Sequence, residues 1–415
     1  MREMKDSGIE WIGAIPQDWQ LSKIGSLYTQ RNEKVSDKDY QPLSVTMQGI
    51  LPQLATAAKT DDGDNRKLVR VGDFAINSRS DRRGSCGISP LDGSVSLINI
   101  ILTPRTAMHP GYYNWLFHTT LFADEFYKWG HGIVADLWTT RWQEMKSITV
   151  PVPEYAEQER IAAFLDAECA EIDAVLEKTR ASIEEYKKLK QAVITQAVTK
   201  GIRGDRPMKD SGIEWIGEIP AEWDVIRVKQ LLKERNERSK EGKEEPLSMS
   251  QKVGLVPTKF LESIPNMASS FVGAKLAYVD DLVFNKLKAH LGVFSVSRYD
   301  GLVSPDYAVY CSTGKSNLKY LEYIFKTPQC IGEFRKKSTG IAAGLMRLYT
   351  EGLFSIYLPY PALSEQEEIA EYLNEKCAGI DALIVKKQQY LTEIENYKKS
   401  LIYEYVTGKK EVLPL

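Results

Sequence analysis

The chain carries the same opening signature twice. The residues MKDSGIEWIGAIPQDW at Met4–Trp19 return as MKDSGIEWIGEIPAEW at Met208–Trp223, in a chain of 415 residues. A repeat of about 20 to 50 residues indicates a solenoid, whereas a repeat of about 200 residues has the size of a domain. The sequence therefore predicts a tandem duplication, in which two similar modules form an internal pseudo-dimer.

The correspondence continues along both halves. The matched anchors, the later ones after a gain of four residues, are Arg31-Asn32-Glu33 with Arg235-Asn236-Glu237, Asn77 with Asn285, Asp92-Gly93 with Asp300-Gly301, and SITVPVP at 147–153 with SIYLPYP at 355–361. Between these anchors the halves differ strongly. A shared frame around a divergent interior is expected when the scaffold is common and the specificity of each module is its own.

Local patterns predict a mixed α/β interior for each module. KLVRVGDFAIN at 67–77 and KLAYVDDLVFN at 275–285 are each typical of a strand, a turn and a second strand. VFSVSRYDGLVS at 293–304 predicts two strands joined as a hairpin at Asp300-Gly301. The segments 111–129 and 317–337 have apolar residues at helical spacing, which predicts helices after the sheet and aromatic side chains in the core.

Each half ends in a segment that predicts one long helix. The ranges 157–199 and 365–407 contain no proline and a single glycine, Gly379, and about 43 helical residues span about 65 Å. Their apolar residues alternate steps of three and four, which predicts a coiled-coil seam. The seam residues are Leu165, Cys169, Ile172, Leu176, Ile183, Tyr186, Val193 and Ala197, then Leu373, Cys377, Ile380, Ile384, Leu391, Ile394, Leu401 and Tyr405. Lys190 and Lys398 interrupt the two seams at one register, and Thr179 and Lys387 at another.

The two long helices are expected to pair with each other. The alternative is that each packs on its own module, but a helix of about 65 Å exceeds the diameter of a domain of this size. A pseudo-twofold axis would make the pair antiparallel and carry the modules to opposite ends. The expected domains are a first module at 1–153, a central spacer helix at 154–200, a second module at 201–361, a C-terminal spacer helix at 362–408 and a tail at 409–415.

Composition bounds the class of protein. The 54 Lys and Arg residues against 56 Asp and Glu residues give a net charge of −2, which neither requires nor excludes a polyanionic partner. Five cysteines without a CxxC pair indicate reduced thiols and argue against structural zinc. No apolar run approaches the roughly 20 residues of a membrane span, and no signal-peptide core follows Met1–Asp6. We therefore expect a cytoplasmic protein without a membrane partner.

Catalytic signatures are absent from the sequence. It contains no GxxxxGK[ST] phosphate loop, no HExxH metal motif and no GxGxxG turn. The tetrapeptide Ser304-Pro305-Asp306-Tyr307 lacks the second proline of an amino-methyltransferase motif and indicates a turn. A nuclease site would combine Asp281 with Lys286 and Lys288, but the first half does not reproduce that set. The sequence therefore favours a binding and organising role over catalysis.

Three motifs, each present twice in the same order, carry a resemblance to a known family. They are the DSGIEWIGxIPxxW openings, the proline-bounded strands that run into Glu157-Gln158-Glu159-Arg160-Ile161 and Glu365-Gln366-Glu367-Glu368-Ile369, and the helix ends at 197–201 and 405–409. Over essentially its full length the chain resembles the specificity (S) subunit of type I restriction-modification systems. The resemblance implies an α+β fold with two pseudo-twofold-related α/β target recognition domains, separated by a pair of long antiparallel coiled-coil helices.

The same resemblance implies a non-catalytic subunit with several partners. These are double-stranded DNA with a bipartite target, two methyltransferase (M) subunits that methylate adenine at N6, and two restriction (R) subunits. S-adenosylmethionine, ATP and Mg would belong to those subunits, so no cofactor is expected on this chain. Two modules on a rigid spacer would independently suit half-sites about one helical turn, or about 34 Å, apart.

Candidate DNA-binding residues follow from polar character and matched position. Bases are read by Arg, Lys, Asn or Gln in a groove, while further cations contact phosphates. The first-module candidates are Asn77, Arg79, Arg82, Arg83, Arg105, Trp138 and Arg141. The second-module candidates are Asn285, Lys286, Lys288 and His290, with Lys252, Arg335, Lys336, Lys337 and Arg347 for phosphates. The alternative is that these cations only keep the surface solvated.

Candidate partner-docking residues lie in the shared frame, because two M subunits need equivalent surfaces. The helix starts offer Glu157, Gln158, Glu365 and Gln366, for which helix capping is the alternative. Two rival functions remain open. One is a self-contained DNA-modifying enzyme, and the other is a scaffold that gathers partner subunits without reading DNA.

Overall fold

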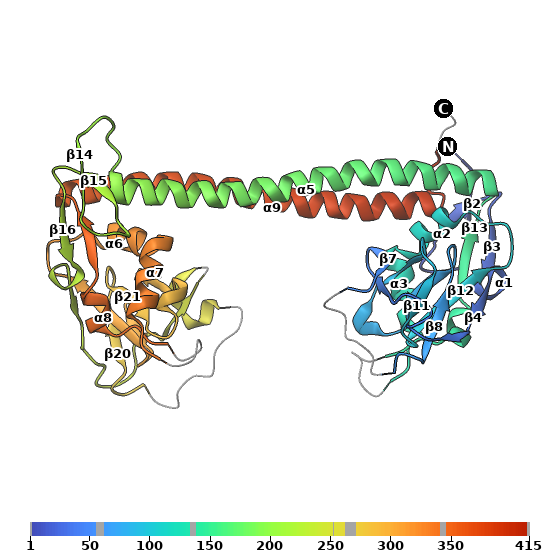
Figure 1. Ribbon diagram of the computed structural model, residues 1–415, viewed down its shortest axis with the longest axis horizontal. Coiled ribbons are helices and arrows are strands. Elements are labelled where there is room, and N and C mark those ends of the chain that lie inside the picture. The colour runs from blue at the N-terminus through green and yellow to red at the C-terminus, as the bar shows by residue number, and fades with distance from the viewer. Residues whose placement is uncertain are drawn as a thin grey trace. The chain divides into compact units, whose positions relative to one another are not determined.

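The computed structural model describes residues 2–54, 62–132, 138–251, 253–261, 271–340 and 346–412. The chain forms two compact units, Met1–Arg180 with Gln388–Leu415, and Ala181–Lys387. Each unit combines one module with the adjoining part of both long helices (Figure 1). The predicted domains treat each helix as a separate segment, whereas the compact units divide both helices between them.

The first unit is built from short antiparallel strands. One sheet has the order β10 (Cys86–Ile88), β9 (Phe74–Asn77), β12 (Asn99–Pro104) and β4 (Tyr28–Arg31). A second has the order β11 (Gly93–Val95), β8 (Arg66–Val69) and β5 (Lys34–Val35). The remaining pairs are β1 (Met4–Asp6) with β2 (Ala14–Pro16), β3 (Gln20–Lys23) with β13 (Thr149–Val152), and β6 (Leu43–Thr46) with β7 (Gly49–Pro52). Its helices are α1 (Ile24–Leu27), the 3-10 turn η1 (Ser80–Arg82), α2 (Pro110–Phe117), α3 (Thr120–Lys128) and α4 (Trp142–Met145).

The second unit repeats this arrangement. Its four-stranded sheet has the order β17 (Leu232–Glu234), β24 (Tyr307–Ser312), β21 (Leu282–Asn285) and β22 (Phe294–Val296). The remaining pairs are β14 (Met208–Asp210) with β15 (Glu218–Pro220), β16 (Asp224–Arg227) with β25 (Tyr357–Tyr360), β18 (Leu247–Ser250) with β19 (Gly254–Pro257), and β20 (Lys275–Ala277) with β23 (Gly301–Val303). Its helices are α6 (Leu318–Phe325), α7 (Pro328–Lys337) and α8 (Thr350–Phe354), with the turns η3 (Val228–Gln230), η4 (Thr258–Phe260) and η5 (Ala289–Leu291). The prediction of mixed α/β modules with helices after the sheet is confirmed.

The hairpin predicted at 293–304 is wrong. Strand β22 pairs with β21, and β23 pairs with β20, so the two strands on either side of Asp300-Gly301 join different sheets. Asp300 instead accepts a hydrogen bond from the backbone of Val279 at 2.6 Å. A Cβ on Gly301 would lie 2.2 Å from the carbonyl oxygen of Glu245, so only glycine fits. The matched pair Asp92-Gly93 is held in the same way.

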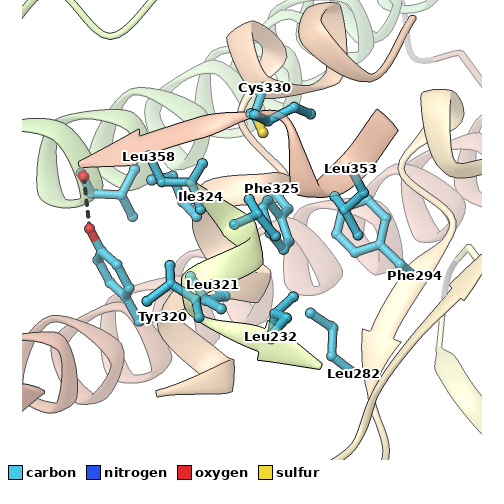
Figure 2. Packing of buried hydrophobic residues seen from close by; sticks show 14 of the residues in the cluster. Leu232, Leu282, Phe294, Tyr320, Leu321, Ile324, Phe325, Cys330, Leu353 and Leu358 are labelled. Atoms are coloured by element: carbon cyan, nitrogen blue, oxygen red, sulfur yellow. Dashed lines mark hydrogen bonds between the residues drawn. The ribbon is translucent and has the colours of Figure 1, made fainter. Parts of the chain in front are cut away.

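A tyrosine in each unit joins the module core to the end of a long helix. In the second unit Tyr320 lies among buried residues of α6, β21 and β25, as Figure 2 shows. Its hydroxyl donates to the carbonyl oxygens of Val198 at 3.2 Å and Pro359 at 3.3 Å. In the first unit the matched Tyr112 donates to the carbonyl oxygen of Val406 at 2.8 Å. Each module is therefore sealed against the C-terminal end of one long helix.

The long helices are α5 (Tyr155–Lys200) and α9 (Leu363–Val406). In the first unit Asp173 of α5 pairs with Lys398 of α9 at 2.6 Å, and Arg180 pairs with Glu395 at 2.6 Å. Because the partner numbers fall as the α5 numbers rise, the helices run antiparallel in this unit. In the second unit Lys190 pairs with Asp381 at 2.6 Å, and this pair is the repeat equivalent of the Asp173–Lys398 pair.

The two lysines predicted to interrupt the seams are therefore neutralised by the facing helix. The other interruption is also accommodated, because the Thr179 hydroxyl donates to the carbonyl oxygen of Val175 at 2.8 Å. Lys387 places its ammonium 5.7 Å from the ring centre of Tyr186. Among the described residues, neither these helices nor any other has the length and apolar composition needed to cross a bilayer.

Candidate nucleic-acid interface

Asn77 and Asn285 close the same turn in the two modules. The side-chain oxygen of Asn77 accepts from the backbone nitrogen of Arg79, and that of Asn285 accepts from the backbone nitrogen of Leu287, both at 3.1 Å. An asparagine oxygen that bonds two residues ahead stabilises a turn. Asn77 is only 7% exposed, so its side chain shapes the loop and presents little surface to a base.

The backbone of each module brings this loop against a second segment. Thr140 donates to the carbonyl oxygen of Ser78 at 2.9 Å, and the matched Leu348 donates to that of Lys286 at 3.0 Å. One position earlier, Thr139 pairs with His131, and the matched Arg347 pairs with Thr339. The two modules therefore use the same backbone hydrogen bonds to place these segments together.

The side chains on this common backbone differ between the modules. Ser78 stands where the second module has Lys286, and Thr139 stands where it has Arg347. Conversely, Arg79 and Arg83 match Leu287 and Leu291. A frame that holds its geometry while its side chains change is suited to reading two different sequences.

The first-module loop presents three exposed arginines. Arg79 and Arg82 lie on either side of Asp81, with Nε 3.4 Å and 3.8 Å from its carboxylate oxygens. Arg83 pairs with Asp124, and its guanidinium carbon lies 5.9 Å from the ring centre of Tyr127. The arginine side chains are 37%, 68% and 50% exposed in chain order, so all three can reach a polyanion.

Two neighbouring concave surfaces collect most of the first-module candidates. One, of about 470 Å³, is lined by Asn77, Asp81, Arg82 and Arg83 among others. The other, of about 570 Å³, is lined by Arg79, Thr139 and Arg141 among others. Both include Ile98, so they share a wall. Trp138 adjoins them, because its carbonyl oxygen accepts from the backbone of Ser80 at 2.9 Å, and it is 38% exposed.

Arg105 does not belong to this group, which corrects its place among the candidates. Strand β12 begins at Asn99, opposite Asn77, and Arg105 follows the other end of the strand. Six residues of strand span about 20 Å. The Arg105 guanidinium donates to the carbonyl oxygen of Tyr28 at 3.0 Å and ties β12 to β4.

The second-module candidates form a surface of different composition. Lys286 donates from Nζ to the carbonyl oxygen of Pro305 at 3.1 Å, and burial lowers the pKa of its ammonium. Arg347 pairs with Asp306 at 3.3 Å, and Lys288 is exposed in the adjoining turn. These residues lie at positions matched to the first-module surface, where the side chains differ.

The remaining second-module candidates are less uniform. His290 is 8% exposed, and its carbonyl oxygen accepts from Arg335 at 3.4 Å, so the imidazole packs inside while the arginine stays outside. Lys336 pairs with Glu333 at 2.7 Å, and Lys337 is also exposed at the end of α7. Lys252 lies outside the described residues.

The carboxylate considered for a nuclease site is structural. Asp281 is 2% exposed and accepts from Arg235 at 2.8 and 3.0 Å. The matched Asp73 accepts from Arg31 at 2.7 and 3.2 Å. Within the described part of the chain, no three His, Cys, Asp or Glu side chains are grouped so that they could hold a metal ion. Both aspartates therefore belong to the shared frame.

Comparison with known proteins agrees with the repeated architecture, although no family model matches the chain. The type I restriction enzyme MjaVIII specificity subunit of Methanocaldococcus jannaschii is 23% identical over 96% of this chain and 94% of that protein. The EcoDI specificity subunit of Escherichia coli is 22% identical over 64% of this chain and 63% of that protein. Over nearly its whole length the chain is therefore similar in sequence to a type I specificity subunit.

Solved structures show the same fold. A chain from a type I R-M system, studied for complex assembly and conformational transition, matches with a TM-score of 0.72 and 13% identity over 95% of this chain and 99% of that one. The HsdS subunit from Thermoanaerobacter tengcongensis matches with a TM-score of 0.54 and 16% identity over 95% of this chain and 98% of that one. The specificity-subunit fold of two α/β domains and long paired helices is therefore present.

The four predicted docking residues are engaged inside each unit. Trp19 donates to Glu157 and Trp223 donates to Glu365, both through Nε1 at 2.9 Å. Glu157 also pairs with Arg2 and raises the pKa of that guanidinium. In the second unit Arg206, whose side chain is 10% exposed, pairs with Glu365 at 2.7 Å.

The two glutamines are equally internal. Gln158 accepts from the backbone of His109 at 2.8 Å, and Gln366 accepts from that of Asn317 at 3.0 Å. Gln158, Glu365 and Gln366 are at most 5% exposed, which corrects the assumption that these side chains form an open docking face. They fix the start of each long helix on its module. The sequence signal for this role is that the partners of the glutamates are repeated too. Trp19 and Arg2 each have an equivalent 204 residues later, at Trp223 and Arg206.

Proposed function

We propose that the chain is the DNA-reading subunit of a type I restriction-modification complex. Each module reads one half of a bipartite double-stranded target, and partner M and R subunits methylate adenine at N6 and cleave. The observation that carries the proposal is the pair of loops with matched backbone hydrogen bonds and unmatched side chains, Ser78 against Lys286 and Thr139 against Arg347. The common geometry would place both loops on DNA alike, while the different side chains would select different bases.

The chemistry is assigned to the partners. In this proposal S-adenosylmethionine, ATP and Mg bind the M and R subunits, and the specificity subunit acts without catalysis in the cytoplasm, where the DNA of such a system lies. The buried carboxylates Asp281 and Asp73 support this division, because each is held by an arginine, Arg235 or Arg31. The paired helices would set the gap between half-sites.

Exposed apolar side chains on the long helices support the use of two M subunits. Val175 and Tyr397 are 40% and 55% exposed, next to the Asp173–Lys398 ion pair. Their repeat equivalents Leu383 and Leu189 are 43% and 49% exposed. Such flanking positions of a coiled coil usually carry Glu or Lys. Each unit therefore offers an equivalent apolar surface, and two copies of one M subunit would find the same docking site twice.

Mapping methylated adenines tests the proposal. The chain is expressed with its M subunits, and in parallel each is expressed alone, in cells without other adenine methylation. We expect one bipartite motif with two different half-sites, and only in cells that hold both proteins. Methylation or cleavage by the chain alone would instead indicate a self-contained enzyme. Assembly with M subunits but methylation without a motif would indicate a scaffold that does not read DNA.

A further inference from the structure

We propose that Asp81 and Asp306 are specificity-determining residues that lower binding to non-target DNA. When DNA is absent, each carboxylate forms an ion pair with an arginine of the DNA-reading surface. It lies where a backbone phosphate would otherwise bind. The inference rests on the proposed function, because it concerns the same surface.

Asp81 forms ion pairs with two arginines of the first-module loop, Arg79 and Arg82. Its two carboxylate oxygens lie 3.4 Å from Nε of Arg79 and 3.8 Å from Nε of Arg82. It lines the same concavity of about 470 Å³ as Arg82 and Arg83, and its side chain is 37% exposed. Carboxylate and phosphate oxygens bind a guanidinium in the same way. A phosphate that reaches Arg79 and Arg82 therefore either displaces Asp81 or lies beside its negative charge.

Asp306 has the same relation to the second module. Its carboxylate lies 3.3 Å from the Arg347 guanidinium, and both side chains are about two-fifths exposed, at 44% and 39%. The backbone nitrogen of Lys286 donates to the carbonyl oxygen of Asp306 at 3.1 Å, which holds this acid beside a second cation. A phosphate approaching Arg347 therefore also meets a carboxylate.

Asp81 and Asp306 are not at matched positions of the repeat, so neither belongs to the shared frame. Asp81 matches Ala289 and Asp306 matches Ile98, whereas the buried frame acids Asp73 and Asp281 match each other. The arginine partners are also unmatched, because Arg347 stands where the first module has Thr139. Both modules thus place an exposed carboxylate on a DNA-facing arginine at different positions. The arrangement is therefore a property of the reading surface and not of the scaffold.

The carboxylates discriminate because target and non-target DNA meet them differently. Non-target binding rests on phosphate contacts, so a displaced carboxylate faces like charge. On the target, base edges in the major groove present amino groups, and a carboxylate accepts from the cytosine N4 amino group. On the target, the displaced carboxylate thus accepts a hydrogen bond from a base. On other DNA it has no such donor and faces like charge. Its presence weakens non-target binding more than target binding.

The test compares two duplexes of equal length. One carries the methylated motif mapped as described above, and the other carries scrambled half-sites. Binding of the full chain with its M subunits is measured by fluorescence anisotropy at several salt concentrations, for wild type, Asp81→Asn and Asp306→Asn. Glu184→Gln is the matched control, because it also removes one exposed carboxylate, the partner of Lys187 at 2.7 Å on α5.

We expect Asp81→Asn to bind the scrambled duplex roughly three- to tenfold more tightly, with a salt slope steeper by about one to two, because Arg79 and Arg82 become available to phosphates. Target affinity should stay the same or fall, so the specificity ratio falls. Asp306→Asn should act in the same direction. Glu184→Gln should leave both affinities within about twofold of wild type, since its ion pair is exposed. Thermal unfolding checks that each variant is folded.

Two results separate the failure of this inference from that of the proposed function. If wild type does not prefer the mapped duplex, the proposed function fails. If wild type prefers it but Asp81→Asn binds the scrambled duplex no more tightly than Glu184→Gln does, only the role of the acids is overturned. Loss of target binding without any gain on the scrambled duplex would make Asp81 a base contact alone, which also overturns the inference.

Discussion

Changing Arg79, Arg82 and Arg83 together to alanine is expected to weaken binding to the target duplex by about a hundredfold or more near 0.15 M salt, because each cation contributes a phosphate or base contact. The three side chains are at least 37% exposed around adjoining concave surfaces, so losing their contacts with Asp81, Asp124 and Tyr127 should leave the module folded. Anisotropy titrations over a range of salt should show a slope lower by about two to three.

Arg105→Ala provides the matched control for this loss. Arg105 is a cation of the same module, but it follows the far end of β12 and bonds the backbone of Tyr28. Its removal should change target affinity by less than about threefold, because one exposed charge at a distance is screened by salt. The surface assignment would be contradicted if Arg105→Ala abolished binding while the triple variant bound like wild type.

Glu365→Ala is expected to destabilise the second unit by about 3 kcal/mol, because Arg206 loses its buried partner and is left with the exposed carboxylate of Glu222, at 3.0 Å. Its side chain is 7% exposed and Arg206 is 10% exposed, and the indole of Trp223 loses its acceptor as well. Glu157→Ala should cost the first unit less, about 1 to 2 kcal/mol, because Glu157 is 13% and Arg2 19% exposed.

Denaturation with urea measures the loss in free energy of unfolding for each variant, and hydrogen exchange shows which unit is destabilised. Glu365→Ala should raise exchange at the start of α9, and Glu157→Ala at the start of α5. Glu368→Ala is the control, since Glu368 pairs with Arg203 at 2.7 Å near the same helix start but is 47% exposed. Its loss should cost at most about 1 kcal/mol. Equal destabilisation by Glu365→Ala and Glu368→Ala would contradict the structural role of the buried pair.

The repeat and the helices could be predicted because their signals lie in the sequence itself. The helices show local apolar spacing, and the repeat shows as a match of one half of the chain to the other. Leu165, Cys169 and Leu176 recur at heptad spacing, and each is buried in α5. The matched openings at Met4 and Met208 form equivalent strand pairs in both units. The loop that holds Arg79, Arg82 and Arg83 could also be found, because three cations follow a buried strand within a divergent segment.

The contacts that join distant segments could not be predicted in this way. The strands around Asp300-Gly301 have hairpin spacing, but strand order depends on which sheet each edge meets. Glu157 looks like an exposed helix-start residue until Trp19, 138 residues earlier, is placed against it. Arg105 shares its charge with the loop arginines, yet the direction of β12 carries it to the other end of the strand. Periodicity and charge specify faces and segments, but not their partners.

Exchanging one module interior tests whether each module reads its own half-site within a common frame. Residues 24–148 would be replaced by residues 228–356, because matched backbone hydrogen bonds close both interiors, Ile24 to Ile148 and Val228 to Ile356, each at 2.9 Å. Methylated adenines are then mapped with the same M subunits. We expect a motif made of two copies of the second module's half-site. A motif that stays unchanged and asymmetric would contradict this expectation.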